Sequence, residues 1–240
     1  MTEPEQPTVA LIHGAFADAG SWAPVVEGLL AAGIKVQAPA NPLRGLASDS
    51  AYTASAIAQI PGRVLAVGHS YGGAVITNAA IPAGNVVGLV FVSAFAPDEN
   101  ETLAEVEGTS RDSALGPALR PAMYPTADGE TAPELYVDPA AFYEVFARDL
   151  PIEQAAVLAA AQRPVAAAAF EEKSGPPAWR TLPSWAVVAT GDKAAGSDVI
   201  LAHAKRANAD TIELDGSHVI MISQPLAVIE VILKALKSVG

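Results

Sequence analysis

The sequence predicts an α/β protein in which a mostly parallel, twisted sheet is flanked by helices and carries a helical insertion. Short apolar runs alternate with helical stretches through the first 97 residues, which is typical of a parallel sheet covered on both faces. The alternation stops at residue 98 and returns after residue 180. We therefore expect a core of residues 1–97 and 181–240. Residues 98–180, called the insertion below, are expected to lie over a site, because so long an interruption is usually functional.

The first part of the core is predicted to hold four strands and three helices. Each strand is a short apolar run, and each helix is bounded by serine, proline or glycine. The strands are expected at 8–12, 34–38, 63–67 and 86–93, and the helices at 21–32, 48–60 and 71–80.

The insertion shows no convincing strand pattern. It is rich in proline, glycine and alanine, with helical pieces at 140–148 and 152–161. After it the alternation resumes. The second part of the core is expected to contain strands at 184–190 and 211–214, a helix from Ser197-Asp198 to Ala207, and a closing amphipathic helix at 225–238.

Composition and charge exclude several classes of function. The net charge of −12 would repel a nucleic-acid backbone, and the absence of cysteine removes disulfides and thiolate chemistry. The first six residues lack the basic and apolar regions of a secretory signal, and the longest apolar stretch, 86–96, is too short to span a bilayer. We expect a cytoplasmic protein that binds neither nucleic acid nor membrane; a homodimer is left open.

The strongest motif is Gly68-His69-Ser70-Tyr71-Gly72, which fits the pattern G-x-S-x-G. A predicted strand runs into it and a predicted helix leaves it, as in the nucleophile elbow of the α/β-hydrolase fold. A serine on so sharp a turn must adopt backbone φ/ψ angles outside the favoured regions. The flanking glycines have no Cβ and so avoid steric clashes at the turn. We therefore interpret Ser70 as a nucleophile rather than as a capping serine in a glycine-rich turn.

A second motif, His13-Gly14-Ala15-Phe16, follows the first predicted strand. The fold places one donor of its oxyanion hole there, because two backbone N–H groups must point at the carbonyl oxygen as it gains charge. We expect the N–H of Tyr71 to be one donor and that of Ala15 to be the other, with Phe16 as a second candidate. His13 itself is interpreted as a buried structural residue.

A serine nucleophile needs an imidazole base, and the base needs a carboxylate. In this fold the chain order is serine, acid, histidine. His218 lies in a loop after the last strand, whereas His203 lies within a helix and is expected to be exposed. Asp192 follows the penultimate strand and is the predicted acid; Asp98, after the preceding strand, is the alternative.

These motifs resemble small bacterial serine esterases of the α/β-hydrolase family, which are related to plant methylesterases and hydroxynitrile lyases. Residues 146–151 and 162–164 also resemble the cap of such bacterial members. The resemblance implies a triad of Ser70, His218 and Asp192 that needs neither cofactor nor metal. It rests on His13-Gly14-Ala15-Phe16, Ser21-Trp22, residues 68–73, Gly216-Ser217-His218 and Ser223-Gln224-Pro225.

The sequence thus predicts an esterase that cleaves a small-molecule carboxylic ester through an acyl-enzyme intermediate. Phe95, Phe142 and Phe146 are candidates to line its substrate pocket. One alternative is a hydroxynitrile-lyase-like acid–base catalyst, although no lysine is convincingly placed to hold cyanide; Lys193 adjoins the predicted acid. The other alternative is a catalytically silent ligand-binding protein of the same fold.

Overall fold

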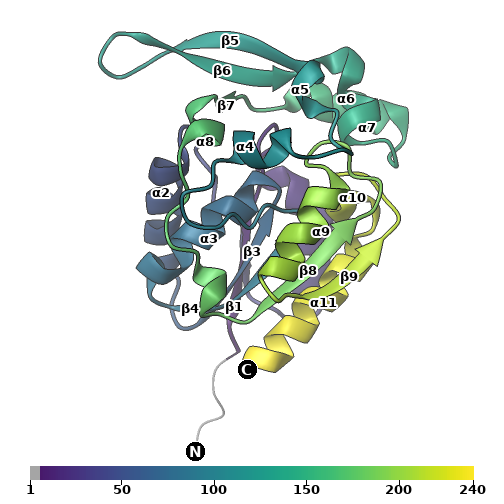
Figure 1. The fold of residues 1–240 in the computed structure, drawn as a ribbon. Helices are drawn as coiled ribbons and strands as arrows, with labels where there is room; N and C mark the ends of the chain where they lie inside the picture. The colour runs from purple at the N-terminus through teal and green to yellow at the C-terminus, as the bar shows by residue number, and fades with distance from the viewer. Residues whose placement is uncertain (1–5) are drawn as a thin grey trace, which may run out of the picture.

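The computed structural model describes residues 6–240 and confirms the α/β architecture with a central parallel sheet. The N-terminal segment considered as a secretory signal lies outside the described residues, apart from Gln6. Six strands are arranged in the order β2-β1-β3-β4-β8-β9 (Figure 1). They are β1 (Thr8–Ile12), β2 (Val36–Gln37), β3 (Val64–His69), β4 (Val86–Val92), β8 (Ser184–Ala189) and β9 (Asp210–Leu214).

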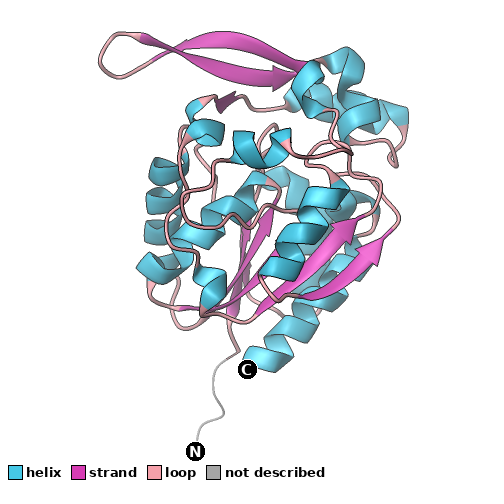
Figure 2. Ribbon diagram, in the orientation of Figure 1, coloured by secondary structure: helices cyan, strands magenta, loops and turns pink. Residues whose placement is uncertain are grey.

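Helices cover both faces of this sheet (Figure 2). On one face α11 packs against α1, β4 and β8; on the other, α3 packs against α2 and β3, and α9 packs against β8. No helix within residues 6–240 is long and apolar enough to cross a membrane. The core helices are η1 (Ala19–Trp22), α1 (Ala23–Ala31), α2 (Leu46–Ala58), α3 (Tyr71–Ala83), α9 (Ser197–Arg206), α10 (Ile220–Ser223) and α11 (Pro225–Val239).

The apolar runs of the sequence explain where the core lies. β1, β3 and β8 are buried along their whole length, because helices shield both faces of a parallel sheet from water. The closing helix α11 buries a stripe spaced at helical periodicity, which includes Val228, Ile232 and Val239.

The insertion differs from the sequence-based expectation because it contains strands. β5 (Leu119–Pro125) and β6 (Thr131–Val137) form an antiparallel hairpin, and β7 (Val165–Ala166) pairs with β6. In Figure 1 the hairpin projects beyond the body, while α6 and α7 lie above the carboxyl ends of the sheet. The helices of the insertion are α4 (Leu103–Gly108), α5 (Leu115–Ala118), α6 (Pro139–Phe146), α7 (Ile152–Ala161), α8 (Ala168–Glu171) and η2 (Ala178–Arg180).

The register of the parallel strands brings distant loops to one edge of the sheet. Ile12 of β1 is opposite Gly68 of β3, and Ala189 of β8 is opposite Leu214 of β9. All six strands point the same way, so the loops after β1, β3, β8 and β9 emerge at the same edge. These four loops carry the residues predicted to form the active site.

Candidate active site

Ser70 occupies the sharp turn that the sequence predicts. It is the single residue between the end of β3 at His69 and the start of α3 at Tyr71. Its backbone has φ 54° and ψ −124°, a region that residues with a Cβ rarely adopt. Such a conformation costs on the order of 1–3 kcal/mol and persists only where the surroundings enforce it.

The flanking glycines enforce this turn by allowing backbone to touch backbone. A Cβ on Gly68 would lie 2.5 Å from the carbonyl oxygen of Gly72. A Cβ on Gly72 would lie 2.3 Å from the carbonyl oxygen of Ile12 in β1. Real Cβ atoms do not approach oxygen so closely, and these oxygens belong to the rigid sheet and helix. The elbow therefore requires glycine at both positions.

Replacing Gly72 with alanine should destabilise the fold by about 3 kcal/mol or more, because the new methyl group overlaps the backbone of β1. Urea denaturation of the variant measures the change. Gly108→Ala is the matched control, since, apart from its chain neighbours and the backbone of its own helix, no atom of the described chain lies within 4 Å of a Cβ built there. If both variants were equally stable, backbone contact would not explain the glycine.

The loop after β1 lies directly against the nucleophile. A Cβ on Gly14 would lie 2.7 Å from the Cβ of Ser70. Within residues 6–240, no protein oxygen accepts a hydrogen bond from the N–H of Ala15, Phe16 or Tyr71. Three unengaged donors beside the elbow match the requirement for stabilising a carbonyl oxygen as it becomes negative.

The side chains of two candidate donor residues, Phe16 and Tyr71, are held by contacts of their own. The Tyr71 hydroxyl donates to Asp49 Oδ2 at 2.8 Å, and burial raises the pKa of both Tyr71 and Asp49. Phe170 of α8 packs against the ring of Phe16 at 6.5 Å and against that of Tyr71 at 6.2 Å. One insertion side chain thus contacts both sides of the candidate oxyanion hole, a role that no local sequence signal indicates.

The structure pairs the predicted acid with the predicted base. His218 Nδ1 donates to Asp192 Oδ2 at 2.7 Å, and both side chains are almost completely buried. Asp192 Oδ1 accepts from the N–H groups of Ala194 and Ala195 at 2.9 and 3.0 Å. The carboxylate is therefore held on both oxygens, and it fixes the imidazole with its proton on Nδ1.

The imidazole of His218 lies between two other rings. His69, next to Ser70, has its ring centre 4.6 Å from that of His218, and Phe146 lies edge-on at 4.7 Å. His69 Nε2 also donates to the carbonyl oxygen of His218 at 2.9 Å. This bond ties the loop of the base to the elbow of the nucleophile.

The rival acid lies elsewhere. Asp98 Oδ1 accepts from Arg180 at 2.5 Å and from the N–H of Glu99 at 2.7 Å. Its side chain is partly exposed and makes no hydrogen bond with His218 among the described residues. The geometry therefore favours Asp192.

His13 and His69 occupy structural positions. His13 Nδ1 donates to the carbonyl oxygen of Gly14, and its Nε2 accepts from the N–H of Asn41, each at 2.9 Å. Burial lowers the pKa of His13 to about 4 and that of His69 well below its usual range. Both rings are therefore neutral, and both brace the loops around Ser70.

The expectation that His203 is exposed was wrong. Only 5% of His203 is accessible, and its Nδ1 accepts from the N–H of Ala96 at 2.9 Å. Burial lowers its pKa to about 4. Val199, Ile200 and Ala204 share this buried face of α9, and their helical spacing is the signal that indicates the burial of His203.

Acid should destabilise the protein through these neutral histidines. The unfolded chain protonates histidine near pH 6.5, whereas folded His203 resists protonation down to about pH 4. Stability therefore falls as the pH falls through this window, by about 2 kcal/mol for His203 between pH 7 and pH 5. Urea denaturation at both pH values should show a shallower loss in His203→Gln than in the wild type. Equal losses would mean that His203 titrates normally.

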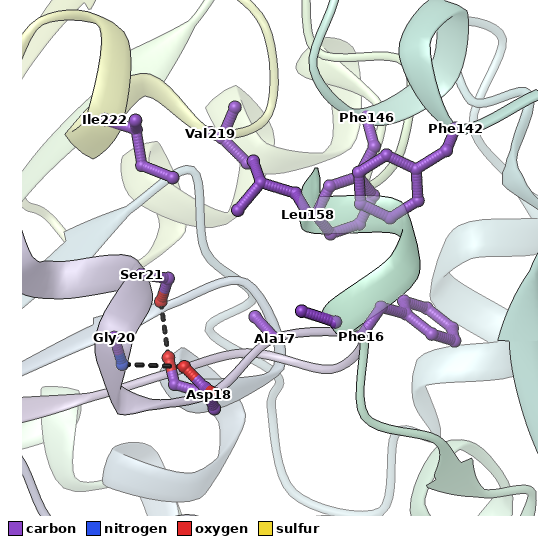
Figure 3. A pocket seen from close by; sticks show the side chains of 11 residues that line it. Phe16, Ala17, Asp18, Gly20, Ser21, Phe142, Phe146, Leu158, Val219 and Ile222 are labelled. Carbon is purple, nitrogen blue, oxygen red and sulfur yellow. Dashed lines mark hydrogen bonds between the residues drawn. The ribbon is translucent and has the colours of Figure 1, made fainter. Parts of the chain in front are cut away.

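A largely apolar pocket of about 80 Å³ is lined by Phe16 of the loop after β1 and by Val219, the residue after the proposed base (Figure 3). Neither Ser70 nor His218 is among its lining residues. Of the three phenylalanines predicted to line a substrate pocket, Phe142 and Phe146 line this cavity, whereas Phe95 does not and packs against the ring of His203. No lysine or arginine of residues 6–240 lines the pocket, and no group of three or more His, Asp or Glu in that range could hold a metal. The lining consists of Phe16, Ala17, Asp18, Gly20, Ser21, Phe142, Phe146, Leu158, Ala161, Val219 and Ile222.

Comparison with known proteins identifies the family. The model of a family described as "Alpha/beta hydrolase family" matches residues 9–231. The chain belongs to the alpha/beta hydrolase family. This agrees with the resemblance seen in the elbow and oxyanion motifs. No curated protein matches the chain.

Solved structures share the fold of this alpha/beta hydrolase at low identity. Polyneuridine aldehyde esterase is 21% identical with a TM-score of 0.80, over 96% of this chain and 99% of that one. Tomato methylketone synthase I, complexed with 2-tridecanone, is 20% identical with a TM-score of 0.77, over 98% and 100%. A pyrethroid hydrolase from Sphingobium faniae JZ-2 is 21% identical with a TM-score of 0.74, over 96% and 97%. At this identity the likeness shows the fold alone.

Proposed function

We propose that the protein is a serine esterase that cleaves small, uncharged carboxylic esters. The observation that carries this proposal is the buried hydrogen bond between His218 and Asp192, at the sheet edge that also holds the strained Ser70 elbow. The fold accommodates several chemistries, so the function is argued from these side chains rather than from the architecture.

In the proposed reaction, Ser70 Oγ forms a bond to the ester carbonyl carbon while His218 Nε2 takes its proton. The N–H of Tyr71 and that of Ala15 or Phe16 stabilise the oxygen that becomes negative. Collapse breaks the bond to the alcohol, which leaves with the proton from His218. Water then attacks the acyl-Ser70 ester by the same route, and releases the acid and the free serine. Asp192 stabilises the imidazolium in both halves.

Covalent labelling tests this assignment directly. A fluorophosphonate should add to Ser70 in the folded protein, with a mass shift confined to the peptide that contains it, and p-nitrophenyl acetate should be hydrolysed. A folded protein that neither reacts with the fluorophosphonate nor cleaves the ester would be a ligand-binding member of the fold. The hydroxynitrile lyase alternative is not favoured, because Lys193 does not line the pocket.

The composition of the pocket predicts selectivity against anionic substrates. Three phenylalanines and no cation line the pocket, so a carboxylate placed there would lose its hydration without a partner. We expect kcat/KM for methyl butyrate to exceed that for monomethyl succinate by about 100-fold or more, which corresponds to roughly 3 kcal/mol. Dimethyl succinate is the matched control and should regain most of the loss. Equal rates for the charged and neutral esters would exclude this pocket as the acyl site.

A further inference from the structure

The carboxylate of Asp149 binds the loop that carries the proposed base. Asp149 lies in the turn between α6 and α7 of the insertion. Its Oδ2 accepts from the N–H of Ser217 at 2.9 Å and from the Ser223 hydroxyl at 2.7 Å. Its Oδ1 accepts from the Ser217 hydroxyl. One side chain of the insertion thus makes three hydrogen bonds with the core.

The residues that donate these hydrogen bonds lie on both sides of His218 in the sequence. Ser217 immediately precedes His218, and Ser223 ends the short helix α10 that follows it. The glycine at position 216 allows the approach, since a Cβ there would lie 2.9 Å from Asp149 Oδ2. The same turn is joined to α6, whose Phe146 packs against the imidazole. The insertion therefore contacts the loop of the base in two ways: Asp149 accepts from the backbone N–H of Ser217, and the Phe146 ring packs against the His218 imidazole.

We propose that Asp149 is a positioning residue for His218, an inference that rests on the proposed esterase function. Ser217 is buried, so its N–H and hydroxyl need partners. Asp149 supplies acceptors for both groups and holds the loop so that the imidazole stays aligned with Asp192. The position of the insertion relative to the core thereby affects the position of the proposed base. Removing this carboxylate leaves the Ser217 N–H without its acceptor and loosens the base.

The expected effect falls on turnover rather than on substrate binding. A misplacement of about 1 Å in a catalytic group can lower a rate about 100-fold. Asp149→Ala should therefore lower kcat by roughly 10- to 100-fold, with KM changed far less. Rates are expressed per reactive site, counted by fluorophosphonate titration, so that misfolded protein does not contribute.

Asp149→Asn should restore most of the activity. The asparagine oxygen can accept from the Ser217 N–H and the Ser223 hydroxyl, while its amide donates to Ser217 Oγ. The Ser217 hydroxyl can then donate to the carbonyl oxygen of Phe146, which already lies 3.3 Å away. This rescue tests hydrogen bonding rather than charge.

Asp198→Ala is the matched control. Asp198 also joins the insertion to the core, because its carboxylate accepts from the Ser110 hydroxyl at 2.6 Å and from the N–H of Arg111 at 2.9 Å. It lies on α9 and makes no hydrogen bond with residues 215–218 in the described chain. Its loss should lower the melting temperature while kcat per reactive site stays near the wild-type value.

The outcomes separate this inference from the function on which it rests. If the wild type is active and Asp149→Ala keeps its kcat, or if Asp198→Ala loses as much, Asp149 does not position the base. If the wild type neither hydrolyses esters nor reacts with a fluorophosphonate, the proposed function is wrong. Hydrogen exchange of residues 215–224 then still decides whether Asp149 holds the loop, since exchange should be faster in the alanine variant.

Should Asp149→Ala fail to fold, Ser223→Ala provides a second test, because it removes one of the three hydrogen bonds to Asp149. It should give a smaller loss of kcat than Asp149→Ala, and an unchanged kcat would count against a positioning role for Asp149.

Discussion

Replacing Ser70 with alanine is expected to lower kcat for p-nitrophenyl acetate by about 10⁴- to 10⁶-fold, because the acyl-enzyme can no longer form. The oxyanion donors and the pocket remain in the variant, so a small residual rate above that of buffer is consistent with the proposal. Initial rates at saturating ester, with the enzyme concentration taken from absorbance, measure the effect.

Two further variants make this result specific. Ser93→Ala changes another serine at a strand end, whose hydroxyl accepts from the N–H of Ala189, and should keep its activity. Ser70→Gly should be as inactive as Ser70→Ala but more stable by about 1 kcal/mol, because glycine adopts a φ of 54° without strain. Substantial activity in Ser70→Ala would assign the nucleophile to another residue.

The main features of the site can be predicted because they follow directly from strand ends. Ser70, Asp192 and His218 each come within a few residues after a strand, and a parallel sheet brings such positions to one edge whatever their separation in sequence. The order of the residue types along the chain then predicts a catalytic role for each of them. No knowledge of side-chain packing is needed for that step.

The hairpin of the insertion was missed because its sequence opposes the usual strand signals. Pro121 and Pro125 lie in β5, an edge strand, and Pro133 lies in β6. Proline removes a ladder hydrogen bond and is therefore taken as evidence against a strand. The turn residues Asp128-Gly129 between the two strands were the available signal, since this dipeptide favours hairpin turns.

The contacts made by the insertion lie beyond local sequence patterns. Asp149 reaches Ser217 across 68 residues, and Phe170 reaches Phe16 and Tyr71 from a four-residue helix. Neither residue stands in a motif whose spacing indicates its partner. The core brings the candidate catalytic groups together through sheet topology, whereas the insertion adds its contacts through tertiary packing. These contacts therefore come from the part of the chain that sequence patterns describe least.

Asp192→Asn is expected to lower kcat by about 10⁴-fold while leaving the fold intact. The asparagine oxygen should remain on the N–H groups of Ala194 and Ala195, where Asp192 Oδ1 now lies. The amide nitrogen then faces His218 Nδ1 and donates to it. His218 must carry its proton on Nε2 instead, so it cannot accept the proton of Ser70. The kcat of the purified variant and its unfolding in urea separate this tautomer effect from a loss of stability.

Asp98→Asn is the control that decides between the two candidate acids. Asp98 pairs with the half-exposed Arg180, and a surface pair of this kind contributes about 1 kcal/mol or less to stability. The variant should therefore retain activity near that of the wild type. A large loss of kcat in Asp98→Asn together with a small loss in Asp192→Asn would transfer the role of acid to Asp98. It would also require His218 to leave a carboxylate that it now contacts at 2.7 Å. Because Asp192 Oδ1 is held by two backbone N–H groups and its Oδ2 by the imidazole, we expect the loss of activity to follow Asp192.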